Sequence, residues 1–103
     1  MKISEIPQKE LAKGIKGRYF HTKSNTIGFI DIEKGAVLPA HSHTHKQITQ
    51  ITEGKLEMTI DGVTQVLESG TIHFIPSNVA HSAVALTNCK VTDIFNPVRE
   101  DYK

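Results

Sequence analysis

Residues 35–54 read GAVLPAHSHTHKQITQITEG, and this stretch contains three of the six histidines of the chain: His41, His43 and His45. Alternate residues of a strand point to the same side, so we expect His41 and His43 to present two imidazoles to one face. Neutral imidazole suits zinc, iron, nickel and copper. An isolated His-x-His pair is also typical of a polar loop. The spacing of the surrounding residues is therefore needed to decide between a metal site and a polar loop.

The spacing along this stretch resembles a known pattern. Five residues separate Gly35 from His41, one separates His41 from His43, three lead to Gln47 and six lead to Gly54. This resembles the first motif of the cupin family, with Gln47 at the position where most members have glutamate.

A second motif begins at Gly70. Five residues lead to Pro76, and Asn78 and His81 follow. This resembles the second cupin motif, whose final histidine completes a metal site. Asn78 replaces the expected glycine but tolerates a left-handed backbone, and Ala85 replaces an asparagine. Neither departure falls on a metal ligand.

The ordered pair of motifs, over 35–54 and 70–85, identifies the chain as a member of the cupin family. The resemblance implies an all-β fold, a jelly-roll barrel or double-stranded β-helix, with a single domain over residues 1–103. It also implies one divalent metal ion, such as nickel, zinc, manganese, iron or copper. The implied ligands are His41, His43, Gln47 and His81. A degenerate cupin that uses the barrel only as a scaffold is the alternative.

The composition fits one small domain and argues against several classes of function. The 103 residues include one cysteine, Cys89, so no internal disulfide can form, and we expect a buried strand thiol there. Twelve basic and eleven acidic residues are spread without blocks, which argues against a nucleic-acid partner. Neither a signal peptide nor an apolar run long enough for a membrane span is found, so we expect a cytoplasmic protein without a membrane partner.

Short runs rich in Ile, Val, Thr and Phe, separated by Gly, Pro, Asn and Asp, predict strands rather than long helices. The expected strands are 16–21, 26–33, 46–52, 55–60, 63–67, 71–75, 81–86 and 90–96. Only residues 8–13 have a helix-forming composition, while Glu53-Gly54 and Asp61-Gly62 are hairpin signals. The strand spacing indicates a sandwich or a closed barrel, and the histidines favour the barrel.

The glutamine in the ligand set affects the expected chemistry. Three imidazoles and an amide carry no negative charge, so a bound ion would keep its full +2 charge and act as a strong Lewis acid. Such a centre favours non-redox chemistry on an anionic or hydroxyl-bearing ligand over oxygenation. The alternative is that Gln47 points into solvent.

Two further histidines have weaker interpretations. His45 is expected either at the surface or in contact with the site. His73 is expected to be a half-buried strand residue.

The last predicted strand continues into a charged end, DIFNPVRED over residues 93–101. Asp93 and Phe95 share one face by alternation. A carboxyl group inside a barrel is costly unless it is paired or functional, which makes Asp93 a candidate acid/base. Arg99 has the fork geometry that holds a carboxylate. On the residues alone, Asp93 could instead face solvent and Arg99 could belong to an ordinary charged tail.

This ending, with the His-His-Gln-His ligand set, resembles the KdgF-type pectin-degradation cupins. The resemblance implies a non-redox, metal-dependent enzyme that converts 4,5-unsaturated uronate monosaccharides into linear keto sugar acids. It implies Asp93 as the catalytic acid/base, and Phe95 and Arg99 as residues that shape and anchor the sugar. A small anionic sugar is then the expected partner, and a homodimer is the expected assembly.

Two other classes of function remain open from the sequence. One is another small-molecule cupin enzyme, a quercetinase-like dioxygenase or an isomerase. A dioxygenase would consume oxygen and would favour iron, copper or manganese. The other is a cupin that binds a sugar or a metal without catalysing a reaction.

Overall fold

The computed structural model describes all residues from 1 to 103 and consists almost entirely of strands. Two short 3-10 helices, η1 (Ile3–Glu5) and η2 (Glu100–Tyr102), lie near the termini. The strands are β1 (Lys9–Ala12), β2 (Ile15–His21), β3 (Thr26–Ile32), β4 (Val37–His41), β5 (Lys46–Glu53), β6 (Lys55–Ile60), β7 (Val63–Glu68), β8 (Ile72–Ile75), β9 (His81–Ala85) and β10 (Cys89–Asn96). None of the helices has the length and apolar character that crossing a membrane requires.

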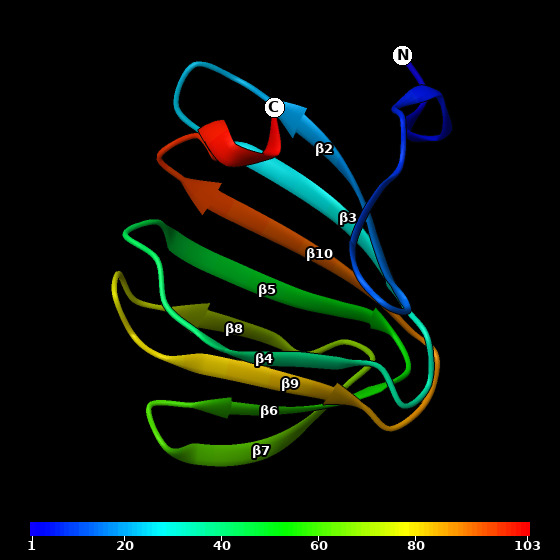
Figure 1. Cartoon of the computed structure of the whole chain (residues 1–103), viewed down its shortest axis with the longest axis vertical. Coiled ribbons are helices and arrows are strands. Elements are labelled where there is room, and N and C mark those ends of the chain that lie inside the picture. The colour runs from blue at the N-terminus through cyan, green and yellow to red at the C-terminus, as the bar shows by residue number, and fades with distance from the viewer.

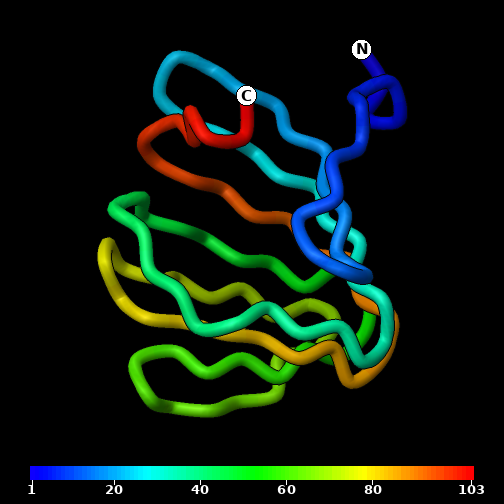
Figure 2. The backbone as a smooth tube through the Cα atoms, in the orientation of Figure 1, coloured from blue at the N-terminus to red at the C-terminus, as the bar shows by residue number.

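The strands form two antiparallel sheets that face each other. The first has six strands in the order β1-β2-β3-β10-β5-β8, and the second has four in the order β4-β9-β6-β7. Figure 1 shows the second sheet below and in front of the first, with the C-terminal η2 beside the ends of β2, β3 and β10. The tube in Figure 2 shows the chain passing repeatedly between the sheets. The expected all-β jelly roll is confirmed.

Alternation of buried and exposed residues identifies the inner face of β5. In β5 the buried positions are Gln47, Thr49 and Ile51, and the residues between them face outward. Ile51 and Ile75 have no exposed surface and lie in the centre of one hydrophobic cluster. Both sheets contribute residues to this cluster. Along β5, the buried residues change from apolar at Ile51 to polar at Thr49 and Gln47.

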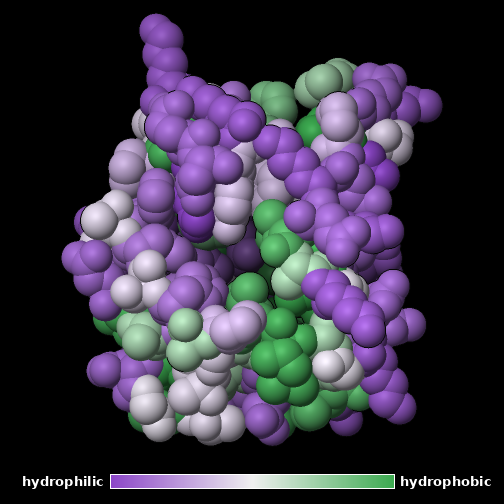
Figure 3. All heavy atoms as spheres, in the orientation of Figure 1, coloured by the Kyte–Doolittle hydropathy of each residue, from purple (hydrophilic) through white to green (hydrophobic).

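On the face drawn in Figure 3, hydrophobic residues gather around a hollow near the middle, and hydrophilic residues cover most of the remainder. A cavity lies inside the fold, and most of its lining residues are hydrophobic. The polar residues that line it are the candidate site residues and their neighbours.

The two hairpin signals have different outcomes. Asp61 and Gly62 have φ values of 49° and 78° and join the paired strands β6 and β7, as a primed two-residue turn requires. Gly54, with φ of 88°, instead carries the chain from β5 in one sheet to β6 in the other. A Cβ at Gly54 would lie 2.2 Å from the carbonyl oxygen of Asn88, so this corner requires glycine. The hairpin expected at Glu53-Gly54 is therefore wrong.

Two segments near the sheet edges differ from the sequence prediction. Residues 8–13 have a helix-forming composition, but Lys9–Ala12 form the edge strand β1, paired with β2. Pairing and the packing of Leu11 and Ala12 against the core override the local preference. The expected strands do not include β4, which contains Pro39. A proline is tolerated there because β4 is an edge strand.

Candidate metal centre and active site

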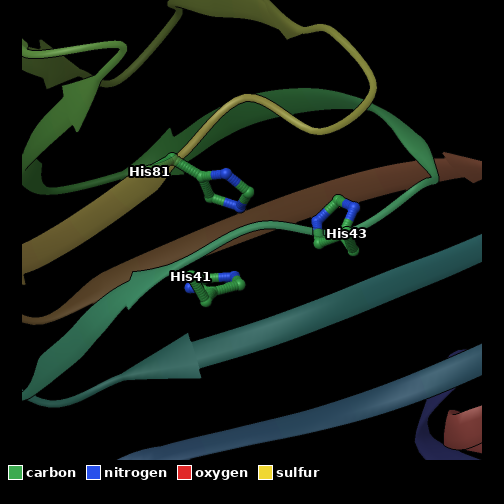
Figure 4. A group of neighbouring side chains, drawn as sticks. All are labelled: His41, His43 and His81. Carbon is green, nitrogen blue, oxygen red and sulfur yellow. The ribbon is translucent and has the colours of Figure 1, made fainter.

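Three histidines from two segments meet at one end of the barrel. His41 is the last residue of β4, His81 is the first residue of β9, and the two are paired in register. His43 follows in the loop after β4, and one ring nitrogen from each of the three lies within 4.8 Å of the others. Figure 4 shows the three rings pointing into one shared space. The structure therefore brings together the three histidines that the motifs selected.

The sequence predicts that His41 and His43 share one face of a strand. The strand β4 ends at His41, so the position of His43 is set by the following loop instead. The loop that carries His43 is held by the loop before His81. The backbone N–H of Asn78 donates to the carbonyl of His43 at 2.8 Å, and the hydroxyl of Ser77 donates to the carbonyl of Thr44 at 2.6 Å. Asn78 has φ of 64°, so the left-handed conformation expected there is confirmed and helps to place His43.

The backbone sets the tautomer of all three imidazoles. The Nδ1 atom of His41, His43 and His81 lies 2.9 Å from a main-chain carbonyl two residues away in each case. These carbonyls belong to Pro39, His45 and Val79. A carbonyl oxygen only accepts hydrogen bonds, so Nδ1 carries the proton and Nε2 keeps a free lone pair. This is how metal-ligating histidines are oriented.

Burial favours the neutral form of two of the three rings. Burial is the main cause that lowers the pKa of His43 and of His81 below its usual value, and the charge of Arg99 acts in the same direction. The Nε2 atom of His81 is buried and has no hydrogen-bond partner in the protein. A buried polar atom without a partner is costly, and a metal ion bound to it would remove that cost.

Gln47 supplies a fourth donor atom, an amide oxygen, to the same space. Its side chain is only 6% exposed, so the alternative in which it points into solvent is wrong. Its Oε1 lies 3.1 Å from Nε2 of His43. Both atoms are acceptors when His43 carries its proton on Nδ1, and two acceptors at this distance fit a shared cation. The residues present therefore fit one divalent metal ion.

Asp93 lies on β10, next to Thr49 across the paired strands. The hydroxyl of Thr49 donates to Oδ1 of Asp93 at 2.8 Å and accepts from Nε2 of Gln47 at 2.9 Å. Asp93 is half-buried and lines the cavity. Burial nevertheless raises the pKa of Asp93 to about 6, while the hydrogen bond from Thr49 and the charge of Arg99 oppose the rise. Asp93 thus lies two hydrogen bonds from the candidate metal ligand Gln47.

Phe95 and Arg99 border the same cavity. The Phe95 ring centroid is 5.8 Å from that of His43, and the Arg99 guanidinium carbon lies 4.8 Å from the Phe95 ring and 4.0 Å from the Tyr102 ring. Arg99 is 7% exposed. Its fork was expected to hold the carboxylate of a sugar; in the structure, one edge of the fork binds Asp101.

Three cavity residues, Thr49, Tyr19 and Tyr102, were missed from the sequence. Tyr19 lies flat over the inner face: a Cβ at Gly17 would be 2.6 Å from its hydroxyl, and one at Gly28 would be 2.8 Å from its ring. Two glycines inside neighbouring strands are the signal that could have found it, because glycine in a strand often marks a close approach.

Comparison with known proteins identifies the family of this fold. Residues 28–95 match the cupin domain family. The chain belongs to the cupin family. This cupin is 33% identical over 102 residues to the pectin degradation protein KdgF of Dickeya dadantii, with 95% of this chain and 92% of that protein covered. The resemblance to KdgF-type cupins expected from the sequence is confirmed.

Solved structures of other small cupins have nearly the same fold. An RmlC-like cupin from Shewanella frigidimarina superposes with a TM-score of 0.92 at 31% identity, covering 97% of this chain and 91% of that one. KdgF from a Halomonas species superposes with a TM-score of 0.91 at 29% identity, covering 97% and 94%. The similarity extends over almost the whole of this cupin and of both relatives.

The remaining sequence expectations for this cupin concern three residues outside the ligand set. His45 is half-buried, its ring centroid is 5.5 Å from that of His43, and its carbonyl accepts from His43 Nδ1. It therefore contacts the site. His73 is half-buried in β8, and Cys89 is 3% exposed, as expected for both.

Proposed function

We propose that this cupin is a metal-dependent enzyme of pectin or alginate breakdown that opens 4,5-unsaturated uronate monosaccharides to linear keto sugar acids. The observation that carries the proposal is the position of Asp93, which lies in the cavity beside the candidate metal ligands. The relative from Dickeya dadantii is named as a pectin degradation protein, which supports the choice of substrate class. The reaction is an isomerisation, so it requires no oxidant and no organic cofactor.

The proposed ligands are the Nε2 atoms of His41, His43 and His81 and the Oε1 atom of Gln47. A bound divalent ion supplies positive charge that stabilises negative charge developing on a sugar oxygen. These four side chains line one cavity together with mostly hydrophobic residues.

Asp93 is the proposed proton carrier. Ring opening moves the proton of the anomeric hydroxyl to the carboxylate, breaks the bond between C1 and the ring oxygen, and leaves an aldehyde and an enolate. Ketonisation then places a proton on C4 as the enolate becomes a ketone. One carboxylate that accepts the first proton and returns it to C4 balances both steps. A pKa of about 6 suits this role, because the group is mostly ionised at neutral pH and still exchanges protons readily.

Arg99 and Phe95 are proposed to fix the sugar relative to Asp93. Nη1 of Arg99 donates no hydrogen bond within the protein, because Asp101 binds only the edge formed by Nε and Nη2. The free edge can bind the uronate carboxylate. The Phe95 ring forms an apolar wall between the guanidinium and His43.

The test is the ultraviolet absorbance of the 4,5-unsaturated uronate, followed with metal-loaded protein and with Asp93→Asn. We expect the wild type to remove the absorbance and the variant to be at least about 100-fold slower, since acid/base groups typically contribute factors of 10²–10⁴. A reaction without protein corrects for spontaneous opening. Unchanged absorbance at high wild-type concentration would refute the proposal, and oxygen uptake would favour a dioxygenase.

A homodimer is the proposed assembly. Five apolar side chains form one row across the outer face of the six-stranded sheet, each paired in register with the next. They are Phe20, Ile27, Ile94, Ile48 and Phe74, and four of them are more than a third exposed. A second copy presenting the same row would cover it, since a two-fold interface uses the same patch on both partners.

A further inference from the structure

Thr49 occupies a central position between the candidate metal ligands and Asp93. It is 2% exposed and lies on the inner face of β5, two residues after Gln47 and opposite Asp93 on β10. Its hydroxyl makes two hydrogen bonds, to Gln47 Nε2 at 2.9 Å and to Asp93 Oδ1 at 2.8 Å. Gln47 in turn places Oε1 at 3.1 Å from His43 Nε2. Three contacts therefore run in one line from a ligating imidazole to the carboxyl group.

The direction of these hydrogen bonds is determined by counting protons. A threonine hydroxyl has one proton to donate, and an ionised carboxylate can only accept. The proton of Thr49 therefore goes to Asp93, and a lone pair of the hydroxyl faces Gln47. Only the NH₂ group of the Gln47 amide can donate to that lone pair. Its Oε1 is consequently turned to the opposite side, where His43 lies.

We propose that Thr49 is a positioning residue that turns the Gln47 oxygen toward the metal ion and couples it to Asp93. The coupling requires an amide rather than a carboxylate at position 47. The orientation of Gln47 by Thr49 is inferred from the geometry alone. Only the effect of this coupling on catalysis by Asp93 rests on the proposed function.

The requirement for an amide follows from the same proton count. A carboxylate at position 47 would have no proton to offer Thr49. Two carboxylates, at positions 47 and 93, would then compete for a single hydroxyl proton in a buried space and would repel each other. This gives a physical reason for the glutamine in this chain at a position where most cupins have glutamate.

The first experiment compares Thr49→Val with Thr49→Ser. Valine keeps the shape of threonine and removes the hydroxyl, whereas serine keeps the hydroxyl. Titration of Ni²⁺ and of Zn²⁺ into metal-free protein by calorimetry measures affinity without any substrate. We expect Thr49→Val to weaken binding by about 10- to 100-fold, as for other groups that orient a ligand, and Thr49→Ser to stay within a few-fold of wild type. Wild-type affinity in Thr49→Val, or equal losses in both variants, would overturn the proposal.

The second experiment does not depend on metal. The melting temperatures of metal-free Gln47→Glu, Asp93→Asn and the double variant are compared at one neutral pH. We expect Gln47→Glu to lower the melting temperature and Asp93→Asn to restore most of the loss. The reason is that the amide introduced at position 93 can donate to Thr49, while Thr49 donates to the carboxylate introduced at position 47. Strictly additive effects would contradict the coupling.

Neither experiment uses a sugar, so the two proposals can fail separately. A wild type inactive on unsaturated uronates would leave the Thr49 results intact. A Thr49→Val variant with unchanged metal affinity would leave the role of Asp93 intact.

Discussion

Arg99 and Asp101 are joined by two parallel hydrogen bonds, from Nε to Oδ1 at 3.0 Å and from Nη2 to Oδ2 at 2.8 Å. The arginine side chain is 8% exposed and the aspartate side chain is 56% exposed. The aspartate thus binds the guanidinium from the solvent side and leaves the other edge for the cavity. The hydrogen bonds from Arg99 are also the main cause that lowers the pKa of Asp101.

Asp101→Asn tests whether this ion pair positions the guanidinium for substrate. We expect KM for an unsaturated uronate to rise a few-fold with little change in kcat, because a half-exposed ion pair contributes at most about 1 kcal/mol. Steady-state kinetics measure both constants, and Glu100→Gln on the same turn is the matched control. A fall in KM would mean instead that Asp101 competes with the substrate carboxylate.

Arg99→Lys keeps the positive charge and removes the planar fork. The stacking of the guanidinium on Phe95 and Tyr102, at 4.8 and 4.0 Å, would also be lost. We expect the KM for the uronate to rise about 10- to 100-fold, since a lysine does not reproduce bidentate or stacked contacts. Equal KM values for the variant and the wild type would indicate that charge alone is sufficient.

Asp93 should make the stability of the metal-free protein depend on pH. Its pKa rises from 3.8 to about 6 on folding, so the folded state binds the proton more tightly than the unfolded state does. Stability is therefore fully present below pH 4 and decreases as the pH rises through 6, by about 3 kcal/mol. Asp93→Asn should lack this decrease. Urea unfolding of both proteins between pH 4 and 8 measures the difference, and parallel pH profiles would contradict it.

Metal affinity should also depend on pH. The metal ion requires neutral imidazoles, and burial lowers the pKa of His43 and His81 below 6.5. These two ligands remain available at pH values where an exposed histidine is already protonated. We expect affinity to be nearly constant from pH 7.5 to about 6.5 and to fall below about 6. Zn²⁺ titrations in this range measure it, and an affinity that did not change down to pH 5 would argue against a three-histidine site.

Phe74→Glu tests the apolar row on the outer face of the six-stranded sheet. The side chain of Phe74 is 52% exposed, so a charge there costs little in a monomer but much in a shared interface. We expect the wild type to sediment as a dimer and the variant as a monomer of unchanged melting behaviour. The exposed Val66 on β7 of the other sheet provides the control, Val66→Glu. A monomeric wild type would contradict the assembly.

The convergence of the four proposed ligand residues could be predicted from sequence because it depends on local spacing. The two motifs place His41, His43, Gln47 and His81 at fixed distances from their turns, and the turns bring them together. The structure places all four side chains around one space, as that prediction requires.

Thr49 and Asp101 could not be predicted in the same way. Thr49 looks like any β-branched residue in a strand, and its importance appears only when register places it opposite Asp93. Asp101 looks like part of a charged tail until the 3-10 turn brings it to Arg99. Strand β1 was missed for a related reason, since residues 8–13 have a helix-forming composition and the pairing with β2 is not visible in it.

The three Nδ1 bonds to main-chain carbonyls have a consequence for how such proteins diversify. Because main-chain carbonyls meet the Nδ1 atoms, the orientation of these imidazole rings does not depend on a side chain of the barrel lining. The residues lining the barrel are then free to change during evolution, and a new substrate preference can arise while the centre stays assembled.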